Sequence, residues 1–150
     1  DVAVAAREFA RVARPGARVC AAVWGEAEKN PWATGIMATI ARHVDMPAPP
    51  PGSPGLFRCA PPGYMRAVFA EAGLRDIAEE EMTCDMVIDT PERYWEFMTD
   101  IAAPVVAGLA KADERARERI RAEVLGLASR FLREGAVRMP AAGTVVVGTR

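Results

Sequence analysis

Apolar residues recur along the chain with the spacing of helices in some segments and of strands in others. In residues 2–12, Ala5, Phe9 and Val12 recur at helical spacing, which predicts a helix with these side chains on its inner face. A proline and a glycine then end this helix. The almost continuously apolar residues 18–24 predict a strand buried on both faces, as in a parallel sheet covered by helices.

The middle of the chain predicts two short helices and a strand. Residues 34–44 and 64–72 carry apolar side chains at helical spacing. Between them, residues 47–55 are rich in proline and glycine, which predicts a loop or an extended segment. Residues 76–88 alternate as a strand does. Consecutive glutamates at 79–81 interrupt this alternation, which indicates a bulge or an exposed edge.

A strong helix start follows the alternating strand. Thr90 can cap a helix whose first residue is Pro91, a position where proline is favoured. Pro104 lies inside the same helical pattern and predicts a kink. The apolar side chains expected on the inner face are Trp95, Met98, Ile101, Ala102, Val105 and Leu109.

A second helix and a last strand complete the chain. Residues 113–133 predict a helix that Gly135 ends, and β-branched residues 143–149 predict a strand. We therefore expect a helical insertion, from about residue 90 to residue 134, between the last two strands. The side chains expected to point inward from the second helix are Ile120, Val124, Leu127 and Phe131.

Composition limits the class of protein. A chain of 150 residues with 51% hydrophobic residues can bury one core, so we expect residues 1–150 to form a single domain. Lysine plus arginine (19) balance aspartate plus glutamate (20), and the absence of a basic excess argues against a nucleic-acid partner. No apolar run approaches the ~20 residues of a membrane span, and no signal peptide is recognisable. We expect a soluble, cytoplasmic protein.

The cysteines do not predict a metal site. Cys20, Cys59 and Cys84 are widely spaced, and His43 is the single histidine. Zinc needs about four ligands placed close together, so no metal is expected. Free, buried thiols in a reducing compartment are the simplest interpretation.

Three segments resemble class I S-adenosylmethionine-dependent methyltransferases. Residues 8–19 resemble the helix, "RPGG"-like turn and fifth strand of that family, with Ala17 in place of the second glycine. Residues 70–77 resemble its "EAGF..V" helix end and sixth strand, and residues 145–150 its terminal seventh strand. The similarity covers nearly the whole chain and is greatest to the ubiquinone/menaquinone-biosynthesis-like branch, whose members mostly methylate small molecules.

The resemblance implies an α/β fold, the C-terminal part of a Rossmann-like methyltransferase sheet with inserted helices. Its last three strands would be present, with the final strand antiparallel and between the other two. The implied function is methyl transfer from S-adenosylmethionine to a small, partly apolar acceptor.

In that family the cofactor is bound by segments that would precede Asp1. We therefore assign no cofactor-binding residue here, and expect a C-terminal fragment that is inactive alone. Loss of the preceding strand would bare one edge of residues 19–23, which predicts a homodimer or an element-swapped fragment.

Several residues are candidates for contacts with the acceptor. Trp24 ends a predicted parallel strand, and ligands bind at the carboxyl ends of such strands. His43 is a weak candidate for a general base, and Asp45 and Asp89 are weaker ones. For each candidate the competing interpretation is simple packing or surface exposure. The residues proposed to bind the substrate are Trp24, Asn30, Trp32, Tyr94, Trp95 and Met98.

Two other functions remain open from the sequence. The chain could be a non-catalytic relative whose helical pair serves dimerisation or binding. It could also belong to another Rossmann-like enzyme, such as a nucleotide-dependent oxidoreductase. A glycine-rich loop with a downstream acid in the preceding sequence would favour the transferase.

Overall fold

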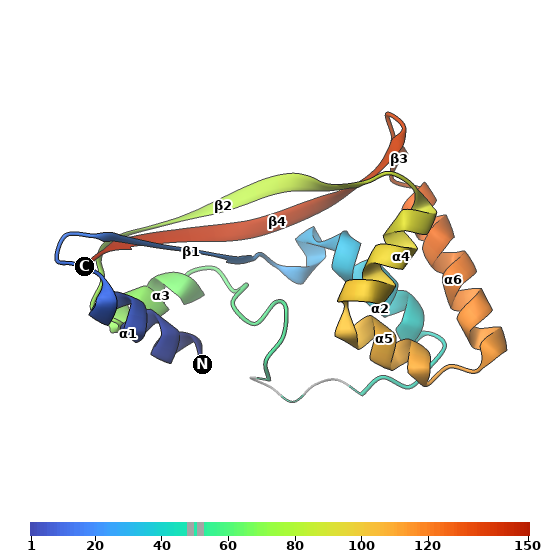
Figure 1. Cartoon of the computed structure of the whole chain (residues 1–150), viewed down its shortest axis with the longest axis horizontal. Helices are drawn as coiled ribbons and strands as arrows, with labels where there is room; N and C mark the ends of the chain where they lie inside the picture. The colour runs from blue at the N-terminus through green and yellow to red at the C-terminus, as the bar shows by residue number, and fades with distance from the viewer. Residues whose placement is uncertain (48–49, 51–52) are drawn as a thin grey trace. The chain divides into compact units, whose positions relative to one another are not determined.

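Helices and strands alternate along the chain in a mixed α/β order. The computed structural model describes residues 1–47, 50 and 53–150 (Figure 1). Four residues of the loop predicted at 47–55 (48, 49, 51 and 52) lie outside this description. The elements are α1 (Val2–Val12), β1 (Arg18–Trp24), the 3₁₀ turn η1 (Ala27–Lys29), α2 (Pro31–Ala41), α3 (Tyr64–Glu71), β2 (Arg75–Ile88), α4 (Pro91–Ile101), α5 (Ala103–Ala110), α6 (Glu114–Ser129), β3 (Leu132–Arg133) and β4 (Ala136–Thr149).

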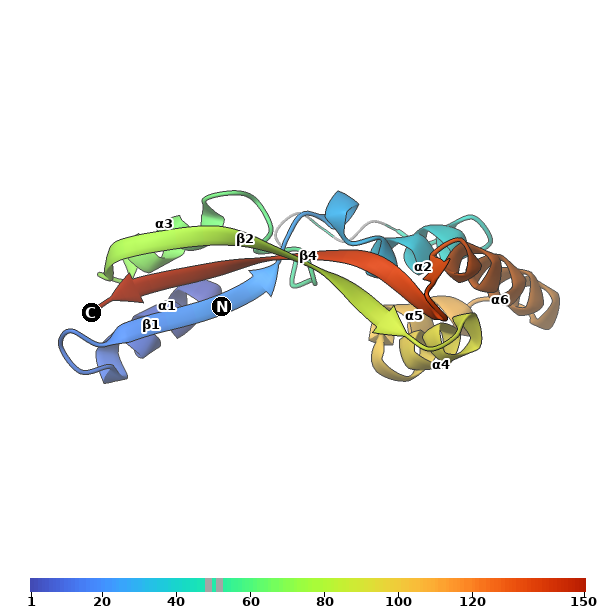
Figure 2. The same cartoon turned by 90° about the horizontal axis from the view of Figure 1, so that it is seen from above.

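The strands form one open antiparallel sheet in the order β1-β4-β2, with the short β3 paired to β4. The register of β1 against β4 runs from Arg18 opposite Thr149 to Trp24 opposite Gly143. Figure 2 shows the arrows of β1 and β2 pointing one way and that of β4 the other. The last strand thus lies antiparallel between the other two long strands, and the sequence prediction of this order is confirmed.

Internal contacts divide the chain into two compact units. Unit 1 consists of Asp1–Glu26, Gly52–Thr83 and Ala142–Arg150, and unit 2 of Ala27–Pro51 and Cys84–Ala141. The long strands β2 and β4 pass from one unit into the other. The predicted single domain stays a prediction.

Unit 1 has helices on one face of its strands. Figure 1 shows α1 and α3 on the same side of the sheet. Val19, Ala21 and Val23 of β1 pack on this helical side, whereas Cys20 and Ala22 are exposed. The prediction that residues 18–24 are buried on both faces is therefore wrong, because neither of the described helices of unit 1, α1 and α3, covers the second face. The buried core consists of Ala6, Ala10, Met65, Val68, Phe69, Leu74 and Val146.

Helix α1 uses a different face from the one predicted. Ala6 and Ala10 are buried, whereas Phe9 and Val12 are 49% and 65% exposed. The small alanine side chains allow α1 to approach α3 and the sheet closely, and this turns Phe9 away from the core. The helix begins at Asp1, whose carboxylate accepts hydrogen bonds from the amides of Ala3 and Val4.

Unit 2 is a cluster of helices in which α4 packs on α5 and α6, and α2 packs on α5 and α6. The buried residues of α4 are Tyr94 and Met98, while Ile101, predicted to point inward, is 59% exposed. A kink was predicted at Pro104. Instead, the helix is interrupted at Ala102, whose extended conformation (φ −96°, ψ 91°) separates α4 from α5. The helix is interrupted here because Pro104 has no amide hydrogen to donate to the carbonyl of Asp100, and its ring would clash with that carbonyl in a continuous helix.

The end of α6 also differs from the prediction. The helix stops at Ser129, and a two-residue turn at Glu134 and Gly135 joins β3 to β4. Both turn residues have positive φ (53° and 78°), as a type I′ hairpin turn requires. Gly135 is therefore a hairpin residue, and β4 begins seven residues earlier than predicted, at Ala136 rather than at Gly143.

Candidate functional site

The site is built on the first turns of α4. Thr90 caps the helix by accepting a hydrogen bond from the amide of Arg93 at 3.1 Å, and Pro91 occupies the first turn. Arg93, Glu96, Phe97 and Asp100 follow at spacings of three and four, so they share one side of the helix. This side is different from the one that buries Tyr94 and Met98.

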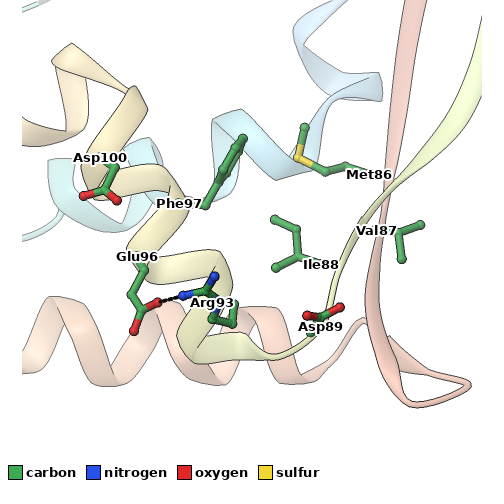
Figure 3. A pocket seen from close by; sticks show the side chains of 8 residues that line it. All are labelled: Met86, Val87, Ile88, Asp89, Arg93, Glu96, Phe97 and Asp100. Atoms are coloured by element: carbon green, nitrogen blue, oxygen red, sulfur yellow. Dashed lines mark hydrogen bonds and ion pairs between the residues drawn. The ribbon is translucent and has the colours of Figure 1, made fainter.

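A cavity of about 540 Å³ lies between this side of α4 and the end of β2. Figure 3 shows the side chains of Met86, Ile88 and Phe97 pointing toward a common space. Asp89 follows the strand, and Asp100 lies one helical turn beyond Phe97. The full lining is Met86, Val87, Ile88, Asp89, Arg93, Glu96, Phe97 and Asp100.

The cavity combines an apolar wall with an acidic rim. Arg93 and Glu96 form an ion pair at 2.6 Å and neutralise each other, although both side chains are more than half exposed. The carboxylates of Asp89 and Asp100 remain as the other charged groups of the lining. Such a cavity suits a small molecule with an apolar body and a polar group that donates hydrogen bonds or carries positive charge.

Three of the six predicted substrate-binding residues meet in a buried hydrogen-bonded chain. The indole Nε1 of Trp32 donates to Oδ1 of Asn30 at 3.0 Å, and the hydroxyl of Tyr94 donates to the carbonyl oxygen of Trp32 at 2.6 Å. Asn30, Trp32 and Tyr94 are 0%, 5% and 0% exposed. Burial raises the pKa of the Tyr94 hydroxyl far above its usual range, so this group stays a donor. These hydrogen bonds join the start of α2 to α4.

The other predicted substrate-binding residues lie apart from this chain. Met98 is 3% exposed in the core of unit 2, and Trp95 is half-buried beside it on α4. Trp24 is half-buried at the end of β1, in unit 1. The cavity is lined instead by other residues of α4 and by residues 86–89 at the end of β2, and substrate contact by the six predicted residues stays a prediction.

His43, the candidate base, has a hydrogen-bond partner that the sequence did not indicate. Its Nε2 lies 2.8 Å from Oε1 of Glu123, while Oε2 of Glu123 accepts a hydrogen bond from Arg42 at 2.6 Å. The hydrogen bond from Arg42, and next that from His43, hold the pKa of Glu123 below its usual value. A carboxylate that holds one imidazole nitrogen and leaves the other to take the proton is the arrangement used in general-base catalysis. Here Glu123 holds Nε2, so a base at this position would have to use Nδ1 of His43.

The lining residues of the cavity could be found only in part from the sequence. Met86 and Ile88 belong to the alternating pattern that predicted β2, and Phe97 lies in the aromatic run that starts α4. Arg93, Glu96 and Asp100 recur at helical spacing, but in the sequence such charged residues indicate an ordinary solvent-exposed face of a helix. Glu123 lies 80 residues from His43, and no local pattern connects them.

The cysteines and the acidic groups supply no metal centre in the part of the chain that the structure describes. There, no cluster of three or more His, Cys, Asp or Glu side chains could hold an ion. The three thiols are free, as expected, but Cys20 and Cys84 are exposed rather than buried. Among the described helices, none has the length and apolarity to cross a membrane.

The sequence matches no protein-family model, and it matches no curated protein. Function is therefore inferred from the residues and their geometry.

Proposed function

We propose that the protein transfers a methyl group from S-adenosylmethionine to a small, partly apolar acceptor, and that residues 1–150 supply the acceptor-binding part. The observation that carries the proposal is the strand order β1-β4-β2 with an antiparallel final strand in the middle. This is the order that the resemblance to class I methyltransferases implies for the fifth, seventh and sixth strands. It is unusual because a strand at the end of the chain is inserted between two earlier ones.

The cavity beside α4 supports an acceptor with an apolar part. Met86, Ile88 and Phe97 can exclude water from one side of a bound molecule. Asp89 and Asp100 can orient a hydrogen-bond donor on the other side. Methyl transfer depends mainly on holding the acceptor atom in line with the donor, so orientation is the contribution that such a cavity makes.

The amide groups at the starts of α3 and α4 do not fit the methyl donor. A donor site of this family needs free amide groups at a glycine-rich turn between a strand and a helix. At the start of α3, the amides of Gly63 and Arg66 already donate to the carboxylate of Glu79, at 2.9 Å and 2.8 Å. At the start of α4, Pro91 lacks an amide hydrogen and Thr90 occupies the amide of Arg93. We therefore assign the donor to no residue of this chain, and the proposal expects its site in sequence encoded before Asp1.

The acceptor assignment is tested by kinetics on a chain extended upstream of Asp1, in an assay that detects transfer of a radiolabelled methyl group to a panel of small acceptors. Phe97→Ala should raise the KM for the acceptor about tenfold, since one aromatic wall of the cavity is lost. Ile101→Ala on the same helix is the matched control, because Ile101 is exposed and does not line the cavity. An equal effect of the two substitutions would remove the cavity from the proposal.

A further inference from the structure

A further cavity, of about 470 Å³, lies in unit 2 between α2 and α6. Each helix contributes four residues at spacings of three and four, so the cavity is the groove between two packed helices (Figure 2). It shares no lining residue with the cavity beside α4, and the proposed methyl transfer does not use it. The full lining is Gly35, Ala38, Thr39, Arg42, Glu123, Gly126, Leu127 and Arg130.

The two helices run antiparallel, which fixes the ends of the groove. Arg42, at the end of α2, binds Glu123 at 2.6 Å. Nearer the start of α2, a Cβ atom added at Gly35 would lie 2.6 Å from Cδ2 of Leu127. Later residues of α6 thus lie beside earlier residues of α2. Arg130, the C-cap of α6, therefore lies at the end of the groove opposite Arg42, and the helical rise places these ends about 10 Å apart.

Small residues form the floor of the groove. A Cβ atom added at Gly126 would meet nothing within 4 Å, so the space above this glycine is open. Ala38, on the facing helix, is exposed. The hydroxyl of Thr39 donates to the carbonyl oxygen of Gly35 at 2.9 Å, so it has no free hydrogen for a ligand. The floor thus offers apolar contact to a slim molecule, and charge recognition depends on the ends of the groove.

The charges of the lining do not cancel. Glu123 is the one acid of the lining, and both of its carboxylate oxygens are engaged, by Arg42 and by Nε2 of His43. Among the described residues, no side chain forms a hydrogen bond or an ion pair with the guanidinium of Arg130. This arginine therefore keeps its positive charge and its N–H donors for a ligand.

We propose that this groove binds a small molecule with a carboxylate or phosphate group at one end of a slim apolar body. The anionic group lies against Arg130, because a planar guanidinium can donate two parallel hydrogen bonds to such a group. The apolar body covers Ala38 and Gly126, where larger side chains would exclude it. The inference does not depend on the methyltransferase proposal.

Nuclear magnetic resonance titration of the ¹⁵N-labelled 150-residue chain tests the ligand class. The probes are phenylbutyrate, phenylpropyl phosphate and phenylbutylamine, which differ mainly in the charged group. At least one of the two anions should bind with millimolar affinity, as expected for a small ligand, and should shift the amide signals of Gly35 and Gly126. The stronger anion distinguishes a carboxylate from a phosphate site. The amine should not bind. Absence of saturable binding by both anions, or equal binding of the amine, would overturn the proposal.

Two substitutions test the location of the site. Arg130→Gln should weaken binding of the anion at least about fivefold, because the charged donor pair is lost. Gly126→Leu should abolish binding by filling the groove, and it should fold because the added Cβ meets open space and leucine favours a helix. Arg121→Gln is the matched control, since Arg121 is exposed on α6 outside the lining, and it should bind like the wild type. Wild-type affinity in Arg130→Gln or in Gly126→Leu would overturn the proposal.

Discussion

Nε2 of His43 lies 2.8 Å from Oε1 of Glu123, and this contact joins the end of α2 to the middle of α6. Arg42 binds the other carboxylate oxygen of Glu123, so one acidic side chain holds two consecutive residues of the α2 terminus. The side chain of Glu123 is 41% exposed, and solvent therefore screens the ion pairs.

The first prediction concerns the acid stability of this contact. The pKa of Glu123 is lower in the folded chain than in the unfolded one, chiefly because of Arg42. Its contribution to stability is therefore complete above the unfolded pKa and disappears as the pH falls through the folded pKa. Glu123→Gln should lower the melting temperature at pH 7 and lower it less at pH 3. Glu118→Gln, on the same helix, is the control, and a difference from wild type that is equal at both pH values would contradict the prediction.

The second prediction concerns the hydrogen-bonded chain of Asn30, Trp32 and Tyr94. Tyr94→Phe leaves the buried carbonyl of Trp32 without the donor that now lies 2.6 Å away. The expected loss is about 1–3 kcal/mol of unfolding free energy, measured by urea denaturation. Tyr64→Phe, at a half-buried tyrosine of α3, should change stability by less than about 0.5 kcal/mol. Equal effects would mean that the Tyr94 hydroxyl does not contribute to stability.

The third prediction compares two glycines on facing helices. A Cβ atom at Gly35 of α2 would lie 2.6 Å from Cδ2 of Leu127 on α6, whereas one at Gly126 would meet nothing within 4 Å. Gly126→Ala should stabilise the chain by up to about 1 kcal/mol because alanine favours the helix. Gly35→Ala should stabilise it less or destabilise it, because the end of the Leu127 side chain has to shift to admit the new methyl group. Thermal denaturation of both variants measures the difference, and an equal gain from both would contradict the close packing of α2 and α6.

The fourth prediction concerns the β3–β4 turn. Glu134 has φ of 53°, a conformation that asparagine and glycine adopt more easily than glutamate. Glu134→Asn should raise the unfolding free energy by about 0.5–1 kcal/mol, although it removes the exposed ion pair of Glu134 with Arg138. Glu134→Gln removes the same ion pair without relieving the backbone and should be neutral or slightly destabilising. A loss of stability in Glu134→Asn would show that the ion pair dominates.

The order of elements could be predicted from the sequence because caps, breakers and periodicity are local signals. Thr90 with Pro91 marked the start of α4 correctly, and the β-branched end of the chain marked part of β4. The faces were harder to predict. In α1, Phe9 is larger and more apolar than Ala6, but the small residue allows the closer approach and is the one buried.

The candidate site was less predictable than the fold. The aromatic residues named from the sequence were Trp24, Trp32, Tyr94 and Trp95. Of these, Trp32 and Tyr94 are buried in hydrogen bonds rather than open to a ligand. The cavity uses Phe97, on another side of the same helix. Which side of α4 faces a neighbour depends on how α5 and α6 pack, and this is a long-range property that periodicity does not contain.

The most direct test of the methyltransferase proposal is calorimetric titration of S-adenosylhomocysteine into the 150-residue chain and into the chain extended upstream of Asp1. Micromolar binding by the extended chain and no binding by residues 1–150 are expected, because here the amide groups at the starts of α3 and α4 are occupied by Glu79 and Thr90. No binding by either chain would contradict a methyltransferase and favour a non-catalytic module or another nucleotide-dependent enzyme. Tight binding by residues 1–150 would contradict the location of the donor site.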